Sequence, residues 1–299
     1  MHVSLGRAFS QAFDITVRRR FLWVYGILLV IFGGQCSLSF WNSGGGADGG
    51  QELDNLLQNN EEFWLGVLVI VLVLVLLFWL LSIVIGNWAL GSLIGGIGQS
   101  AETGGGSLSA AAQAGAGAWL RLVGIGFLTA IAALPLVAPL VILGSIVFLT
   151  GAEGLVVVLV LWLPIALIGI VAVSLVATLA QIYAVRTDLG VFGSLGAGWR
   201  LFTGNAGDIL VVWLANDLAV GCATGCVTMT VIALSVIPAV LGFLINPALG
   251  LVLLAPALLF LLVIFVITGI VKVFQKAIWV LAYRDLTGPP LEAAPEPPV

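Results

Sequence analysis

Charged residues are scarce in this sequence. Of its 299 residues only 8% are charged, whereas 61% are hydrophobic, and the mean hydropathy is +1.23. A soluble globular domain has about 25% charged residues. A surface so short of charge would not stay in water, so we expect lipid to be the solvent around most of the chain.

Histidine and cysteine are also rare, and their positions exclude several kinds of site. The one histidine, His2, stands at the N-terminus, which excludes catalytic triads that use histidine and helical zinc motifs within this chain. Cys36, Cys222 and Cys226 have neither the spacing of a metal site nor a disulfide framework. The glycine-rich stretches lack the Lys-Ser/Thr of a phosphate loop. We therefore expect no catalytic residue, no cofactor, no metal and no enzymatic activity.

Long apolar runs are abundant. A helix crosses the hydrocarbon core with about 20 apolar residues, and six stretches reach that length: residues 21–41, 63–85, 119–149, 155–185, 209–240 and 248–271. The sequence therefore predicts an all-α polytopic membrane protein with six transmembrane helices. The first stretch has an alternative interpretation as a signal peptide. We favour a retained helix, because the stretch follows 20 residues that themselves read as a helix and lacks a clear cleavage pattern.

The basic residues predict the orientation. Six spans leave seven terminal or connecting segments on alternating sides, and all the basic residues fall on one side. Cytoplasmic segments are enriched in Lys and Arg, so both termini should be cytoplasmic. Arg18, Arg19 and Arg20 stand beside Trp23 and Tyr25, which suit an interfacial aromatic anchor, and Trp64, Trp119 and Trp279 at other span ends predict the same role. The basic residues are Arg7, Arg18, Arg19, Arg20, Arg121, Arg186, Arg200, Lys272, Lys276 and Arg284.

Three cytoplasmic segments, beginning at Ser4, Ser107 and Ser194, share a Ser-Leu start and precede a predicted pair of spans. Their apolar spacing is typical of amphipathic helices that lie in the membrane interface. The pattern predicts one membrane domain over residues 1–287, built from three helix-plus-hairpin repeats (1–96, 97–187 and 188–287). A shared Gly/Ala-rich composition is the alternative explanation. Residues 288–299 contain five prolines and are expected to form a disordered or extended cytoplasmic tail.

One polar site stands out within an apolar run. Asp217 lies nine residues after Asp208, about 13 Å along a helix. An intramembrane carboxylate is costly and should face protein or water. Asn216 and Asp217 could line a solute or proton path, with Asn87 or Gln181. Two alternatives remain: a protonated Asp217 bonded to a neighbouring helix, or a later start of the span that leaves Asp217 near the interface.

Gly221 and Gly225 come after this site at a spacing of four residues. Small residues at that spacing let helices approach closely. The pattern predicts tight packing inside the bundle, with a dimer face as the alternative.

The two ends of the chain also carry a resemblance. The opening "LGRAFSQAFDITVRRRFLWVYGILLVIFGG" and the closing "VFQKAIWVLAYRDLTG" resemble bacterial six-helix membrane proteins similar to the membrane domain attached to some glycerophosphodiester phosphodiesterases. Tyr283-Arg284-Asp285 stands where that class has a Tyr-Arg-like motif at the end of its last span. The phosphodiesterase catalytic domain has no counterpart here, so the resemblance implies a membrane module and no catalytic residue.

The sequence supports two hypotheses for function. The preferred one is a non-enzymatic scaffold, assembly factor or membrane partner of other proteins, since no chemistry is evident. Its competitor is a small-solute or lipid transporter that uses the Asn216–Asp217 region. Membrane lipids and other membrane proteins are the expected partners, and nucleic acid is not. A polar cavity near mid-membrane that reaches Asp217 would favour transport, whereas dry packing of Asp217 against small side chains would oppose it.

Overall fold

Helices are the only regular secondary structure in the part of the chain that its structure, a computed structural model, describes. The described residues are 5–33, 61–151, 153–187, 189–221, 224–226, 229, 237–238, 242 and 246–288, and they contain no strand. This confirms the predicted all-α class. In chain order the elements are α1 (Leu5–Arg18), α2 (Phe21–Phe32), α4 (Glu61–Thr103), α5 (Leu108–Thr150), α6 (Glu153–Arg186), α7 (Val191–Gly204), α8 (Ala206–Trp213), the π-helix η2 (Leu214–Val220) and α10 (Pro247–Thr287).

Long helices dominate the structure. Among the described residues, four stretches are long and apolar enough to cross a membrane: Gly66–Thr103, Leu108–Thr150, Gly154–Arg186 and Gly250–Thr287. The protein is therefore a membrane protein. At 43 residues, α5 is about 64 Å long, roughly twice the hydrocarbon thickness. Length beyond the bilayer is thus available for packing outside it.

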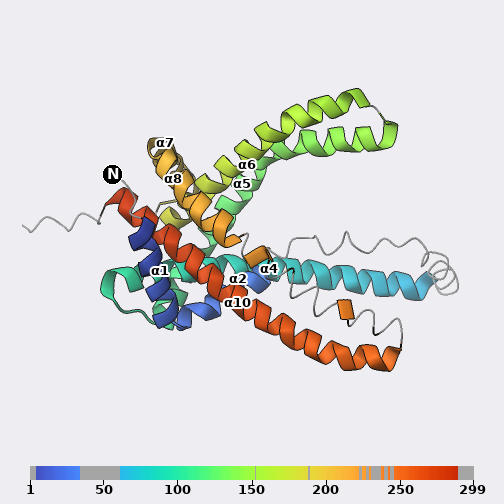
Figure 1. Cartoon of the computed structure of the whole chain (residues 1–299), viewed down its shortest axis with the longest axis horizontal. Helices are drawn as coiled ribbons and strands as arrows, with labels where there is room; N and C mark the ends of the chain where they lie inside the picture. Colours follow the sequence, from blue (N-terminus) through green and yellow to red (C-terminus); the bar gives the residue numbers. More distant parts are fainter. Residues whose placement is uncertain are drawn as a thin grey trace, which may run out of the picture.

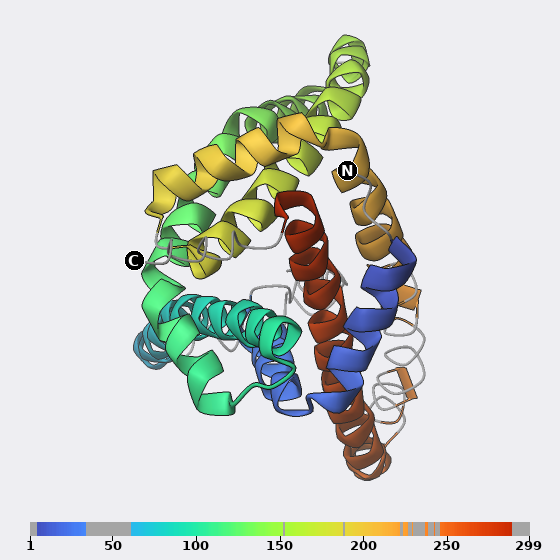
Figure 2. The ribbon, with the colours of Figure 1, turned by 90° about the vertical axis from the view of Figure 1, so that its left-hand side faces the viewer.

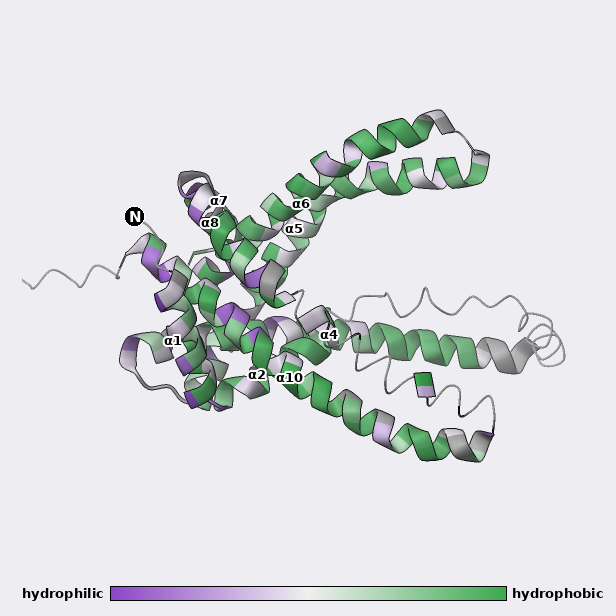
Figure 3. Ribbon diagram, viewed as in Figure 1, coloured by the Kyte–Doolittle hydropathy of each residue, from purple (hydrophilic) through white to green (hydrophobic). Residues whose placement is uncertain are grey.

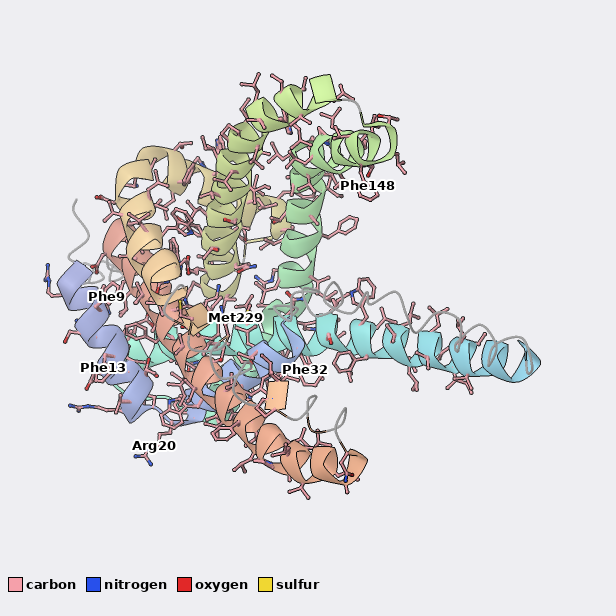
Figure 4. All side chains as sticks on the ribbon, turned by 45° about the vertical axis from the view of Figure 1, so that its right-hand side comes forward. Phe9, Phe13, Arg20, Phe32, Phe148 and Met229 are labelled. Atoms are coloured by element: carbon pink, nitrogen blue, oxygen red, sulfur yellow. The ribbon has the colours of Figure 1, made fainter. Side chains whose placement is uncertain are left out.

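Each long helix has an apolar part and a packed part. The apolar parts diverge from a common cluster of helices (Figure 1). Hydrophobic residues cover the diverging parts, and hydrophilic residues gather in the cluster (Figure 3). Phe148, near the tip of the α5–α6 hairpin, is 89% exposed (Figure 4). Such exposure is what lipid-facing helices require, because lipid tails solvate apolar side chains.

Four of the six predicted spans correspond to these long helices, and two do not. The first predicted span begins as α2, which has 12 residues, and residues 34–41 lie outside the described part of the chain. The fifth predicted span begins as α8 and η2, and most of residues 222–240 are also outside it. Six spans therefore remain a prediction. The acidic residues 48–62 and the tail at 289–299 likewise fall outside the described residues, apart from the helical start of α4.

The predicted repeat differs in its middle unit. Helices α1 and α7 are separate 14-residue helices, as expected for the first and third units. Residues 107–122, by contrast, run straight into α5. The hydroxyl of Ser107 caps that helix by accepting the amide of Ala110 at 3.2 Å. No separate interfacial helix is described there, and the threefold repeat stays a prediction.

The hydrophobic core lies at the end of the molecule that carries the arginines. Figure 2 looks onto this end, with the C-terminal part of α10 at its centre and α1 alongside. Helices α2, α4, α6, α8 and α10 each contribute fully buried side chains to this core. In chain order, examples are Leu22, Ile94, Leu179, Ile209 and Ile278. This core holds together helices whose other halves diverge.

Glycines set the closest helix crossings. A Cβ added to Gly26 of α2 would lie 2.3 Å from the carbonyl oxygen of Gly269 in α10. One added to Gly91 of α4 would lie 3.0 Å from the Cα of Gly115 in α5. These pairs let the backbones touch. At Gly221 and Gly225, where we predicted such a crossing, a Cβ would meet no described atom within 4 Å. The described part of the chain therefore shows no tight helix contact at those two glycines.

The predicted aromatic anchors have different roles in the structure. The ring of Tyr25 is 2% exposed, and its hydroxyl donates to the carbonyl of Leu108 at 2.9 Å. The indole of Trp23 donates to the carbonyl of Thr16 in α1 at 2.8 Å. Tyr25 is thus a core residue that ties α2 to α5, and its prediction as a lipid-facing anchor is wrong, because the adjacent helices cover it.

Candidate functional site

The chain adopts a π-helix at the polar site predicted from the sequence. Helix α8 ends at Trp213, and η2 then runs over Leu214–Val220, which includes Asn216 and Asp217. A π-helix adds a residue to the turn and is frequent at functional sites, because it redirects side chains. Asn216 is fully buried and donates to the carbonyl of Gln275 in α10 at 3.3 Å. This bond anchors η2 on α10.

Asp217 opens onto a cavity rather than packing dry. The cavity has a volume of about 460 Å³ and lies between α2, α4, α6, η2 and α10. Its wall combines charged, polar and apolar side chains. The lining residues are Leu29, Gly33, Leu90, Ser174, Thr178, Gln181, Asp217, Gly221, Lys272, Gln275, Lys276 and Trp279.

Three of the four predicted site residues meet here. Asp217 and Gln181 line the cavity, and Asn216 supports the carboxylate by donating to its Oδ1 at 3.3 Å. Asn87 does not join them. Its side chain donates to the carbonyl of Ile83 within α4 at 2.8 Å, and it is outside the cavity wall. The structure therefore does not bring Asn87 to Asp217, because this amide bonds to its own helix.

Trp279 fixes the carboxylate from the other side. Its indole nitrogen donates to Oδ2 of Asp217 at 3.2 Å, and the residue is 3% exposed. Each carboxylate oxygen therefore accepts a hydrogen bond from a protein donor. The expectation that Trp279 anchors a span end at the lipid interface is wrong, since the ring is buried and serves Asp217.

Two lysines complete the site, and sequence reasoning missed their role. Lys272 and Lys276 line the cavity and interact electrostatically with Asp217. They are one turn apart on α10 and so share a face. From the sequence they were only cytoplasmic charges, and Asp217 had no visible basic partner. The available signal was that Lys272 is the first charge after the uncharged residues 247–271.

Two hydroxyl groups of the cavity wall already donate hydrogen bonds within α6. The hydroxyls of Ser174 and Thr178 donate to the carbonyls of Val171 and Ser174 at 2.8 and 2.9 Å. Both hydroxyl protons are therefore used in hydrogen bonds to carbonyls of α6. The two hydroxyl oxygens remain available as acceptors at the cavity wall. Among the residues that the structure describes, no group of three or more His, Cys, Asp or Glu side chains could hold a metal ion.

Comparisons with known proteins add no further assignment. The resemblance to the membrane domain attached to some glycerophosphodiester phosphodiesterases therefore stays a prediction. Any functional assignment has to be argued from the cavity. No protein-family model, no curated protein and no solved structure matches this chain.

Proposed function

We propose that this protein is a carrier or permease of six spans in a bacterial cytoplasmic membrane, with both termini cytoplasmic. It binds a small solute, or the polar head of a lipid, in the cavity between α2, α4, α6, η2 and α10. The observation that supports the proposal most is that Asp217 faces a cavity shared with Gln181, Lys272 and Lys276.

The free-energy cost of placing Asp217, Lys272 and Lys276 in this protein favours a functional role for them. Ionisable groups within a membrane-embedded helical protein are expensive and usually mark a substrate or ion path. Replacing buried ionic groups with apolar side chains is often neutral or stabilising, so structure alone does not require them. The π-helix at Asn216 and Asp217 supports the same conclusion, since it directs both residues toward α10.

A scaffold role was the first expectation from the sequence, and it has weaker support. It depended on the lack of recognisable chemistry. The cavity is a specific feature that a scaffold does not need, whereas a carrier does. We therefore place the transport hypothesis first.

Uptake into proteoliposomes tests the proposal. The probes are radiolabelled acetate, inorganic phosphate, glycerol 3-phosphate, glycine and methylammonium, and protein-free liposomes give the background. We expect at least one probe to accumulate, and Asp217→Asn to reduce its uptake about tenfold or more, as loss of a charged binding partner does. The variant should keep the wild-type elution profile and thermal stability.

Asp14→Asn is the matched control, because Asp14 is an exposed carboxylate of α1 that pairs with Arg18 at 2.5 Å, away from the cavity. It should transport like the wild type. Failure of every probe to exceed the background, or full activity of folded Asp217→Asn, would overturn the proposal.

A further inference from the structure

We infer that the cavity takes an anion that bears a phosphate group, contributed by a soluble phosphate ester or by a phospholipid headgroup. This inference rests on the proposed function and names the ligand class of its site.

The donors and acceptors of the cavity are out of balance. Both oxygens of Asp217 already accept protein hydrogen bonds, from Asn216 and Trp279. Within the described part of the chain, Lys272 and Lys276 have no hydrogen bond and no ion pair within 4.0 Å. Each ammonium carries three N–H donors. A ligand that pairs with these two lysines must therefore supply acceptors.

Charge leads to the same conclusion. The wall contains two lysines and one aspartate, so the fully ionised cavity carries one excess positive charge. Uncompensated charge is costly away from water, and an opposite charge nearby relieves that cost. An anion would be stabilised here more than a neutral solute, and a cation would be repelled.

A phosphate fits these donors better than a carboxylate does. Its three terminal oxygens can accept from two ammonium groups at once, and lysine is an established phosphate-binding side chain. Lys272 and Lys276 are one helical turn apart, so both can reach one tetrahedral group. A carboxylate has one oxygen fewer and one negative charge.

The position and size of the cavity favour an organic phosphate. Its lysines follow the uncharged residues 247–271 of α10, and basic pockets between transmembrane helices are known to bind lipid headgroups. A volume of about 460 Å³ leaves room beyond the phosphate itself. Leu29 and Leu90 supply apolar wall for the carbon part of an ester.

Calorimetric titration of the full-length, delipidated protein in detergent tests the inference. Glycerol 3-phosphate is the soluble probe, dihexanoyl phosphatidic acid is the lipid probe, and acetate is the comparison anion. We expect at least one phosphate probe to bind with a Kd below about 1 mM, and acetate to bind at least tenfold more weakly. Binding of the soluble probe alone identifies a soluble ligand, and preference for the lipid probe identifies a headgroup.

The double variant Lys272→Gln/Lys276→Gln should weaken phosphate binding at least a hundredfold, and each single variant about tenfold. The single variants keep the test valid if the double variant does not fold. Arg20→Gln is the matched control, because it removes one positive charge from an exposed residue outside the cavity (Figure 4), and it should bind like the wild type.

Several results would overturn the inference. Absence of binding by both phosphate probes, acetate binding as tight as phosphate, or wild-type affinity in both single lysine variants would each do so. The proteoliposome assay separates this failure from failure of the proposed function. If a probe without phosphate accumulates through Asp217 while phosphate does not bind, the carrier stands and only its ligand class is wrong.

Discussion

Basic side chains occupy two kinds of environment in this protein, helix ends and the cavity wall. Arginines gather at helix ends: Arg121 donates to the carbonyls of Ala184 and Thr187, both at 3.2 Å, and Arg284 donates to that of Ala101 at 3.3 Å. Carbonyls at a helix C-terminus lack partners and carry partial negative charge, so a cation there stabilises the end. The two lysines line the cavity instead.

Arg121→Gln should destabilise the end of α6. The variant removes a charged donor shared by several carbonyls at the end of α6 and beyond it, at a cost of about 1–3 kcal/mol in the free energy of unfolding. Thermal unfolding followed by tryptophan fluorescence measures the change. Arg200→Gln is the comparison, since Arg200 donates to Gly196 within its own helix. Equal stability of the two variants would contradict the capping role.

Trp279→Phe should weaken substrate binding at the site while keeping an aromatic ring in the buried core. The ring is replaced by a smaller apolar one, but the hydrogen bond to Oδ2 of Asp217 is lost. We expect uptake of the transported probe to fall about tenfold, mostly through a higher KM. Uptake measured over a range of probe concentrations gives the KM of the variant. Trp162→Phe is the comparison, because it loses a hydrogen bond to Leu136 outside the cavity. Unchanged KM in Trp279→Phe would show that the bond does not position Asp217 for binding.

Among the helices, the crossing of α2 and α10 is the tightest point near the cavity. Gly26 and Gly269 bring the two backbones together, and Leu29, one turn after Gly26, reaches the cavity wall. The position of α2 in that wall therefore depends on the absence of side chains at the crossing. The π-helix η2 positions another part of the wall, because Asp217 in η2 is hydrogen-bonded to Trp279 of α10.

Gly26→Ala should separate α2 from α10. Its Cβ would lie 2.3 Å from a backbone oxygen that cannot move alone, and such overpacking costs about 1–3 kcal/mol. Gly126→Ala in α5 is the control, because nothing lies within 4 Å of its Cβ, and it should be neutral or stabilising by up to about 1 kcal/mol. Melting temperatures in detergent decide between them, and equal values would contradict the tight crossing.

The whole molecule divides into a packed, arginine-bearing end and diverging apolar helices (Figures 1 and 3). Because cytoplasmic segments are enriched in basic residues, we expect the packed end to face the inside of the cell. On that expectation, α5 runs from a cytoplasmic start at Leu108 to the opposite side of the membrane. Gly151, with φ 64°, ends the helix in the left-handed conformation.

Cysteine labelling tests this orientation. In a background with Cys36, Cys222 and Cys226 replaced by serine, Ser109→Cys should react with a membrane-impermeant maleimide only from the cytoplasmic side. Thr150→Cys, at the other end of α5, should react only from the opposite side. Right-side-out and inverted vesicles provide the two conditions. Reaction of both cysteines from one side would mean that α5 does not cross the membrane.

Sequence reasoning found part of the site and missed the rest for a physical reason. Asp217 stood out because a carboxylate in an apolar run is rare and costly, and Gln181 was predicted beside it. Asn87 was also expected there but does not line the cavity, because its amide bonds within its own helix, to Ile83. Lys272 and Lys276 were overlooked, since a lysine after an apolar run is expected at any cytoplasmic helix end.

Composition and periodicity by themselves determined that the chain is helical and lies in lipid, because each long helix satisfies its own backbone and exposes apolar side chains. Four of the spans could be predicted for that reason. Only the tertiary structure decided which polar groups meet. Asp217 and the lysines of α10 are more than 50 residues apart in the sequence, and glycine crossings and the π-helix, which no local pattern specifies, bring them to one cavity.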